Sequence, residues 1–401
     1  MKARRFVAWG LITLVLMAGS SAATWWVATS KTRLEASRIP VSMLNSTQFQ
    51  RFVSTYQLIR SKSIWHNTPN QLLLGATNGM VGTLHDQFTN YLTGGQTQNL
   101  ESLLAPSYVG IGIEVTLKKP LTIQSVFPGT PAAKAGLRAG EAITAVNGHN
   151  TASMSPNAAM QLIHGKVGTR VDLTIREGSQ TRHVTLTRAR IPYPTVYSEM
   201  LPGGLAYMNI VEFGQDTGTE AVQQFHQLMR QHPKGIVLDL RDNPGGEITA
   251  ALQVANLFVP KGPVVTLKYK NAKKDATYDS LGPGTRLPVV VLVNGGTASA
   301  AEILSAAIQE RQGGLLVGTR TYGKGIVQQV IPLSDGASLK LTVARYYTPN
   351  GDYIEHKGLI PNIQVVEPTN VQPSDIPAQD PQLRAAIAAL ENMIKKGVYG
   401  K

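Results

Sequence analysis

The chain has 401 residues, with 38 Lys and Arg against 25 Asp and Glu, and a formal net charge of +13 at pH 7. No strongly basic run follows the first five residues, so a nucleic-acid-binding tract is not indicated, and the diffuse charge fits anionic lipid or wall polymer equally well. Because the chain has no Cys, disulfides, thiolate metal sites and a cysteine nucleophile are excluded.

The N-terminus combines a basic start with an apolar stretch. MKARR is followed by 23 uncharged residues, Phe6 to Ala28. As a helix this stretch would be about 34 Å long, which is enough to cross a bilayer. The basic start favours a cytoplasmic N-terminus, so we predict an uncleaved signal anchor in residues 1–30, with the rest of the protein outside the cytoplasm. The small-residue run AGSSAA leaves cleavage by signal peptidase open as an alternative.

Residues 46–104 are predicted to form a small helical region. Apolar residues recur at helical spacing on both sides of Thr68-Pro69, which has the pattern of a helix cap followed by Pro at the first helical position. The region is too thin to hold much core. We therefore expect it to pack on a neighbouring part of the chain or on a second copy.

Two domains with different patterns follow. Residues 105–190 alternate short apolar runs with turns and short helices, and the run RVDLTIREGSQTRHVTLTRA predicts a hairpin. Residues 191–370 alternate buried strands such as GIVLDL and PVVVLV with amphipathic helices, which predicts a layered α/β domain. One of these helices, starting at Thr217, is expected to carry a capping box with Glu220. Residues 371–401 are predicted to form a Pro-rich link and a last helix.

The first candidate site is the run LDLRDNPGGEITAA, Leu238 to Ala251. A buried strand enters Gly245-Gly246, and a helix follows. Backbone N–H groups at such a turn, together with the positive end of the helix, suit a developing oxyanion. An ordinary helix-entry turn is the alternative.

The second candidate site is the run VNGGTASAAEILSAA, Val293 to Ala307. Another buried strand leads through a glycine pair into a helix whose first turn holds Ser299. This serine is either a nucleophile or a plain N-terminal cap, which is a common role of serine.

The third candidate site is Lys324 in VGTRTYGKGIVQQ, which is nearly a phosphate-binding loop. A phosphate loop needs Ser or Thr after the Lys and a helix behind it, but here Gly325 follows and IVQQVIPL predicts a strand. The phosphate interpretation therefore fails. A surface turn lysine remains the alternative, although the carboxyl ends of adjacent strands can bring Lys324 to Ser299.

Other catalytic chemistries find little support. The Gly-x-Ser-x-Gly elbow of lipases and the His-Glu-x-x-His metal motif are both absent from the chain. None of the eight His follows a strand of the α/β domain beside a glycine turn, so a His-dependent hydrolase using Ser299 is an unsupported rival. We predict no metal and no cofactor.

The three runs together resemble the carboxy-terminal processing, or tail-specific, serine proteases of the Ser/Lys type, which join a PDZ domain to an α/β protease core. GTASAAE resembles the family's serine motif, YGKGIVQ its lysine motif and LRDNPGG its oxyanion loop. The runs GIGIEV and GTPAAKAGLRAGEAITAVNG resemble the peptide-binding loop of a PDZ domain and its companion turn. The resemblance extends from about Phe49 to Leu390.

The resemblance implies specific roles. Ser299 would be the nucleophile, Lys324 the general base and Gln328 its assistant, while Gly245 and Ala300 would supply oxyanion donors. The PDZ loop would bind a substrate C-terminus through Gly110, Ile111, Gly112 and Ile113. The implied protein is an α/β protease core with an inserted α+β PDZ domain, anchored in the bacterial envelope. Its partners would be proteins with accessible C-termini, the membrane, and a second copy bound through the N- and C-terminal helices.

Two features limit the resemblance. Thr297 and Ala301 replace serines of the family motif, and His164 stands where many relatives have Arg, so gating between the PDZ domain and the protease is a candidate role for His164.

A lysine acts as a base only when neutral, so its ordinary pKa of about 10.4 must fall by about 3 units to work near pH 7. Apolar neighbours and a helix N-terminus could lower it. A PDZ module on an inactive core remains a rival.

Overall fold

The computed structural model describes residues 40–104, 107–116, 119–127, 129–192, 194–366 and 380–397. The predicted anchor in residues 1–30 lies outside these ranges, so it stays a prediction. Among the described residues, no helix has both the length and the apolar character needed to span a bilayer. The chain divides into two compact units, Met1–Leu100 with Gln328–Val343, and Glu101–Val327 with Ala344–Lys401.

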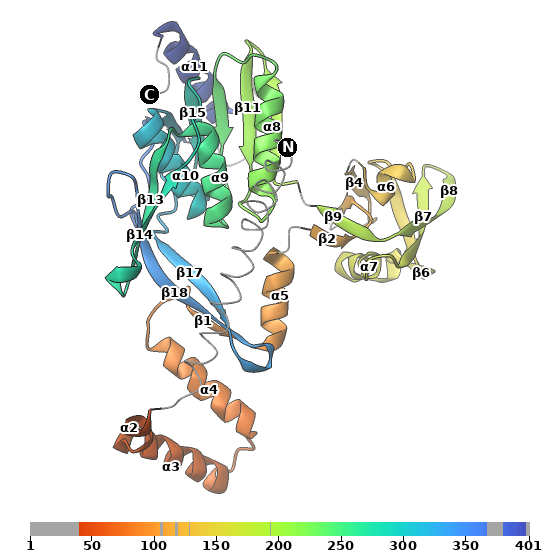
Figure 1. Cartoon of the computed structure of the whole chain (residues 1–401). Coiled ribbons are helices and arrows are strands. Elements are labelled where there is room, and N and C mark those ends of the chain that lie inside the picture. Colours follow the sequence, from red (N-terminus) through yellow and green to blue (C-terminus); the bar gives the residue numbers. More distant parts are fainter. Residues whose placement is uncertain are drawn as a thin grey trace, which may run out of the picture. The chain divides into compact units, whose positions relative to one another are not determined.

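The first unit begins with helices, as predicted. It holds α2 (Val41–Leu44), α3 (Thr47–Lys62), α4 (Pro69–Gly82), the short strand β1 (Asn90–Leu92) and the start of α5 (Gly94–Leu104) (Figure 1). Thr68 caps α4 in a capping box with Gln71, and Pro69 takes the first helical position. No residue of α3 or α4 is buried, which agrees with the expectation of a region with little core.

The first unit also contains strands from a distant part of the sequence. Strand β17 (Ile326–Pro332) pairs with β18 (Ser338–Tyr347), and β1 pairs antiparallel with the beginning of β18. The hydroxyl groups of Thr97 and Ser338 form a buried hydrogen bond of 2.9 Å, although they are 241 residues apart in sequence. Strand β1 was missed by the sequence analysis, which expected helices throughout 46–104.

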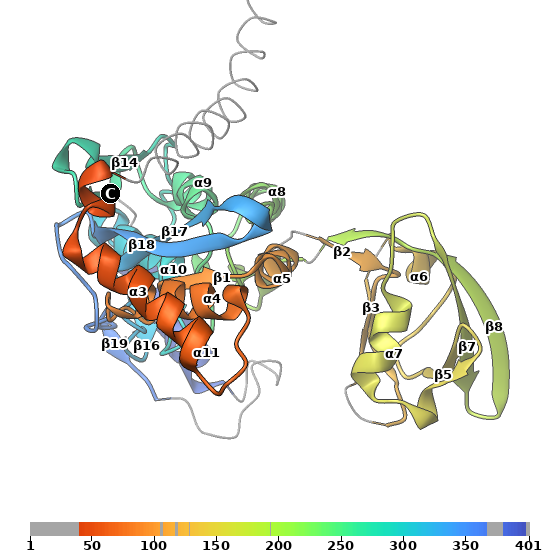
Figure 2. The ribbon, with the colours of Figure 1, turned by 90° about the horizontal axis from the view of Figure 1, so that it is seen from below.

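Residues 107–192 form a small α+β module (Figure 2). Its sheet β6-β5-β7-β8 includes the predicted hairpin, in which β7 (Arg170–Glu177) pairs antiparallel with β8 (Gln180–Thr187). Helix α7 (Pro156–Ile163) covers a core of fifteen buried apolar residues, among them Ile143, Val171 and Leu173. The other strands and the short α-helix are β2 (Ser107–Gly110), β3 (Ile113–Val115), β4 (Ile123–Val126), α6 (Pro131–Lys134), β5 (Ala142–Val146), β6 (His149–Asn150) and β9 (Ala189–Pro192).

The α/β part of the second unit is built on a six-stranded sheet of order β10-β11-β12-β15-β16-β19, in which only β10 is antiparallel. The strands are β10 (Val196–Leu201), β11 (Leu205–Ile210), β12 (Ile236–Asp239), β15 (Val289–Val293), β16 (Leu315–Gly318) and β19 (Ile363–Gln364). Every residue of β12 and β15 is buried, as expected for central strands with both faces covered.

The helices of this part are α8 (Thr217–Met229), α9 (Ile248–Phe258), α10 (Ala300–Ala307) and α11 (Pro381–Lys395) (Figure 1). The last of these packs its apolar side chains onto β12, β15 and β16, with Leu383, Ala386, Leu390 and Met393 in one cluster with Val237 and Leu292. A further hairpin, β13 (Gly262–Tyr269) with β14 (Ala276–Ser280), pairs with the end of β18.

The predicted capping box at Thr217 is wrong. The N-cap of α8 is Asp216, and Thr217 is the first helical residue. The Glu220 carboxylate instead accepts the backbone N–H and the hydroxyl of Thr195, both at 2.9 Å. The Glu220 side chain therefore makes a tertiary contact with Thr195 in place of the predicted contact with the start of the helix.

Candidate active site

Ser299 lies where β15 turns into α10. It occupies the N-cap of the helix, so the alternative of a capping serine is right about position. Its backbone, however, has φ 55° and ψ −117°. An ordinary N-cap has extended backbone, and a non-glycine residue in this region is strained, which is common at functional sites. The half-buried side chain is thus held on a sharp strand-to-helix turn.

Gly245 lies against this turn. A Cβ atom at Gly245 would be 2.7 Å from the Ala298 carbonyl oxygen, 2.8 Å from Ser299 Cβ and 2.9 Å from the Ala300 nitrogen. With φ +94° as well, only glycine fits there without displacement. The two glycine turns that the sequence singled out separately therefore form one site, and the Gly245 and Ala300 backbones are neighbours.

Asn243 ties the two turns together. Its side-chain amide donates to the Ile210 carbonyl at 2.7 Å, and its Oδ1 accepts the Gly245 N–H at 2.8 Å. Its carbonyl accepts the Ala298 N–H at 2.9 Å. The Gly245 N–H is thus engaged by Asn243, whereas the Ala300 N–H belongs to the first residue of α10 and has no acceptor within the helix.

Glu302 joins the serine and lysine segments. Its Oε2 accepts the backbone N–H groups of Ser299 and Lys324, each at 2.9 Å, so the two nitrogens lie within twice that distance of each other. Its Oε1 accepts the Thr321 hydroxyl at 2.5 Å and the Gly323 N–H at 2.8 Å. The Tyr322 N–H adds a bond to the Thr297 carbonyl at 3.0 Å.

The carboxylate of Glu302 is fully buried. Burial raises its pKa above that of an exposed glutamate, while its four hydrogen-bond donors act in the opposite direction. Sequence reasoning missed this residue. Its place in the GTASAAE run, three residues after the serine, was the available signal.

The loop that holds Lys324 is pressed onto residues 354–358. A Cβ at Gly323, where φ is +81°, would lie 2.6 Å from the Gly358 nitrogen, and a Cβ at Gly325 would lie 2.8 Å from the Glu355 nitrogen. The Glu355 carboxylate accepts the Gly325 N–H. Strand β17 follows this loop, as the argument against a phosphate loop expected. Lys324 is half-buried, so it is not an ordinary surface turn lysine.

Tyr346 is a second residue that the sequence did not reveal. Its hydroxyl donates to the Ser299 carbonyl at 3.3 Å from a ring that is 1% exposed. Burial, with the nearby Glu302 carboxylate, raises its pKa well above the ordinary value, so the hydroxyl is a donor at every physiological pH. Tyr346 therefore supports the strained serine turn through this hydrogen bond.

Gln328 belongs to the other unit of the chain. It lies on β17, and its side-chain amide donates to the Thr342 hydroxyl at 3.4 Å. Its predicted role beside Lys324 stays a prediction.

The predicted peptide-binding residues lie between β2 and β3. Gly110 ends β2, Ile113 begins β3, and Gly112 has φ +86° at the bend. A Cβ at Gly112 would lie 2.3 Å from Thr130 Cβ, so only glycine lets the loop pack on the cap of α6. The Ile111 carbonyl accepts the Ala132 N–H at 2.9 Å, which fixes the loop to that helix.

His164 is the C-cap of α7. Burial, and secondarily the positive charge of Arg188, lowers its pKa below the usual 6.5. Arg188 itself is 7% exposed and donates to the Leu162 and Ile163 carbonyls, both at 2.8 Å, at the end of the same helix.

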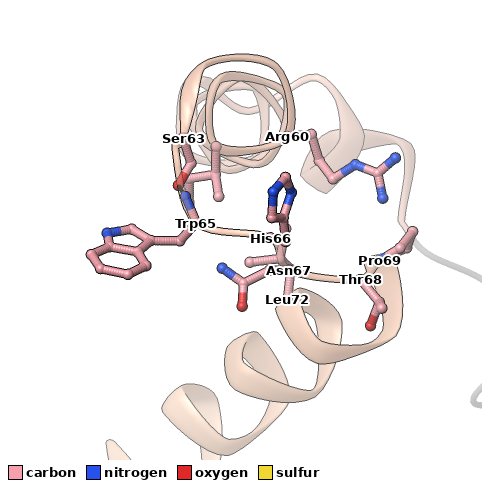
Figure 3. Close-up of a pocket in the computed structure, with 9 residues that line it drawn as sticks. Arg60, Ser63, Trp65, His66, Asn67, Thr68, Pro69 and Leu72 are labelled. Atoms are coloured by element: carbon pink, nitrogen blue, oxygen red, sulfur yellow. Dashed lines mark hydrogen bonds between the residues drawn. The ribbon is translucent and has the colours of Figure 1, made fainter.

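A separate hollow of about 390 Å³ lies in the first unit, where α3 meets α4 (Figure 3). Arg60, Trp65, His66 and Leu72 are among its lining residues, and Trp65 points away from the other side chains drawn. It contains none of the predicted site residues. Among the described stretches of the chain, no cluster of three or more His, Asp or Glu side chains is suited to hold a metal ion.

Two family profiles match this chain. The profile of peptidase family S41 matches residues 204–365, and the PDZ domain profile matches residues 122–177. The carboxy-terminal processing protease CtpA of Bacillus subtilis is 36% identical over 325 residues, which is 80% of this chain and 70% of the relative. The carboxy-terminal-processing protease of Bartonella bacilliformis is 32% identical over 80% of this chain and 76% of its own length.

Two solved structures are also similar to this chain. A photosystem II D1 C-terminal processing protease is 32% identical, with a TM-score of 0.49 over 81% of this chain and 88% of that one. A putative S41 protease of Bacteroides fragilis is 21% identical, with a TM-score of 0.53 over 82% and 93% of the two chains. The two profiles and the two sequence relatives show that the chain belongs to peptidase family S41 and is a serine-type, PDZ-containing carboxy-terminal processing protease.

Proposed function

We propose that Ser299 and Lys324 carry out peptide hydrolysis as nucleophile and general base. The observation that supports this most directly is the Glu302 Oε2 atom, which accepts the backbone N–H groups of both residues. Neutral Lys324 takes the proton of the Ser299 hydroxyl as the oxygen attacks the substrate carbonyl, and returns it to the leaving amine. Water then hydrolyses the acyl-enzyme by the same route. Gln328 would orient the lysine amine without adding a negative charge.

The Gly245 and Ala300 amides would stabilise the oxyanion of the tetrahedral intermediate. The Ala300 N–H is the first of α10, where the helix dipole adds positive potential. The Gly245 N–H donates to Asn243, so it can serve the oxyanion only by sharing or exchanging that bond. Asn243 would then adjust the oxyanion site as substrate binds.

The PDZ loop would select substrates by their C-termini. Backbone N–H groups around a tight glycine turn can capture a terminal carboxylate, while the peptide adds to the sheet as a strand. Gly112 provides such a turn, with φ +86°. The substrates would then be proteins with loose, apolar C-terminal segments.

A pair of peptides tests this function. We expect the wild-type protein to cleave an unstructured peptide with a free C-terminus, and the same peptide with an amidated C-terminus to be cleaved with at least about tenfold lower kcat/KM, because the amide lacks the charge that the loop captures. Steady-state cleavage of both peptides, followed by mass spectrometry, gives the ratio. Equal rates for the two peptides would remove C-terminal selection.

We also propose that residues 1–30 anchor the chain, with its catalytic part outside the cytoplasm of a bacterial cell. The basic start and the uncharged stretch Phe6 to Ala28 support this. Recovery of the full chain from washed membranes, and its release after deletion of residues 1–30, would measure the anchoring.

A homodimer through the N-terminal helices is a further proposal. The helices α3 and α4 bury none of their residues, and Phe52, Leu58 and Leu73 are 44–58% exposed. The apolar side chains of helix α11 pack on its own sheet, so this helix would contribute only its outer face to a dimer interface. Light scattering of the chain with and without residues 40–82 would test this.

His164 would act as a pH gate. Burial and the nearby Arg188 lower its pKa below the ordinary value of 6.5, so it is mainly neutral at pH 7 and gains a proton at lower pH, where it would carry the positive charge that Arg supplies in relatives. We expect the ratio of wild-type to His164→Arg peptidase activity to rise as pH falls from 7 through this lowered pKa. Parallel pH–rate profiles measure the ratio, and a constant ratio would exclude the gate.

A further inference from the structure

A buried ionic network joins the C-terminal helix to the strand that leads into the Gly245 turn. Arg241, just after β12, is 8% exposed. Its guanidinium donates to Asp239 Oδ2 at 2.6 Å and to Asp380 Oδ2 at 2.8 Å. Tyr207 adds a hydroxyl bond of 2.8 Å to the same Asp239 oxygen. Buried charges are stable only when paired, so removing any one of these groups is expected to destabilise the others.

Asp380 is fixed independently of Arg241. It is the N-cap of α11, and its Oδ1 accepts the Leu383 N–H at 2.9 Å. Beside it, Gln382 is fully buried, accepts from Arg241 at 3.3 Å and donates to the Val365 carbonyl at 2.8 Å. Asp380 therefore presents a carboxylate oxygen to Arg241 from a rigid support.

The other end of the network leads directly to the candidate active site. Three residues separate Arg241 from Gly245. Asp242, between them, has φ +57° and donates its N–H to Asn294 Oδ1 at 2.9 Å. Asn243 then contacts both Gly245 and Ala298, as described above. A shift of Arg241 would therefore be transmitted along the backbone to Gly245. It would reach the Ser299 turn through the hydrogen bond between Asn243 and Ala298. A misplacement of about 1 Å can cost a catalytic site about 10²-fold in rate.

We propose that Asp380 is a positioning residue for peptide hydrolysis: through Arg241 it fixes the turn that carries Gly245. The C-terminal helix thereby contributes to catalysis, although it lies beyond residue 365, where the peptidase profile ends. This inference rests on the proposed role of Gly245 as an oxyanion donor.

Asp380→Asn in the full chain tests the proposal. Asparagine caps helices as well as aspartate does, so α11 keeps its cap, but it cannot carry the charge that pairs with Arg241. We expect kcat for a peptide substrate to fall about tenfold or more, with KM changed less than about twofold, because a misplaced oxyanion donor acts on the transition state and not on substrate binding.

Leu390→Ala is the matched control. The substitution leaves a cavity where the same helix packs against Val237 and Leu292, and it changes no contact of Arg241. We expect it to lower Tm while leaving kcat unchanged at a temperature well below Tm. Wild-type kcat in Asp380→Asn would overturn the proposal, and so would an equal loss of kcat in both variants.

Ser299→Ala in the same assay separates this proposal from the proposed function. An active Ser299→Ala protein would refute the role of the serine, whereas an inactive one beside a fully active Asp380→Asn would refute the positioning role alone. If Asp380→Asn gives no folded protein, Asp380→Ser, which also caps a helix, is judged by the same criteria.

Discussion

Replacing Lys324 by Met is expected to lower kcat for peptide hydrolysis at neutral pH by about 10³-fold, since a positioned general base contributes about 10²- to 10⁴-fold. Methionine keeps most of the length and apolar character of the lysine stem, so the half-buried site stays filled. Ser299→Ala is expected to remove activity at least as completely, because no nucleophile remains. Initial rates with a quenched-fluorescence peptide measure both variants.

Lys357→Met is a suitable control. This lysine is exposed, and it lies in the segment on which the Lys324 loop packs. Its loss removes one positive charge from the same surface without touching Glu302, so we expect nearly wild-type rates. Full activity of Lys324→Met would support the rival, a His-dependent hydrolase that uses the same serine. A wild-type protein that binds the peptide without cleaving it would support the scaffold interpretation.

The sequence predicted the parts of the site that depend on local patterns and on strand order. The strands that end at Asp239, Val293 and Gly318 are adjacent and parallel, as the convergence argument required. Each run of buried β-branched residues became a strand, and the glycine turns after Asp239 and Val293 became the two halves of one site. This worked because the positions of glycines and the lengths of apolar runs follow from local backbone chemistry.

Contacts between distant residues could not be predicted in this way. Glu302 looked like an ordinary residue in the first turn of a helix, and Tyr346 like one aromatic residue in a strand. Their partners, the Lys324 loop and the Ser299 carbonyl, are set by tertiary packing. The pairing of β1 with β18 and the ion pair between Arg241 and Asp380 also join residues that no local pattern relates. The failed capping box at Thr217 has the same cause, since Glu220 found a partner in Thr195.

Gly245→Ala is expected to lower kcat by about 10²- to 10³-fold, which is the usual effect of losing one oxyanion donor. The added methyl group would overlap Ser299 Cβ at 2.8 Å and the Ala298 carbonyl oxygen at 2.7 Å. Both contacts are shorter than real Cβ contacts, so the serine turn or the Gly245 turn must move. The φ of +94° adds backbone strain. Steady-state kinetics should therefore show the loss mainly in kcat, with Tm lowered by a few degrees.

Gly295→Ala separates this local effect from a general intolerance of the glycine turns. Gly295 lies four residues before Ser299 in the same connection, yet a Cβ there meets no atom within 4 Å and its φ is not in the left-handed range. We expect this variant to keep wild-type kcat and Tm. If Gly245→Ala were equally active, the close approach of the two turns would have no catalytic consequence, and the oxyanion role would have to pass from Gly245 to other backbone amides of the turn. The comparison thus tests whether the glycine is required because its hydrogen atom is the only group that fits beside the serine.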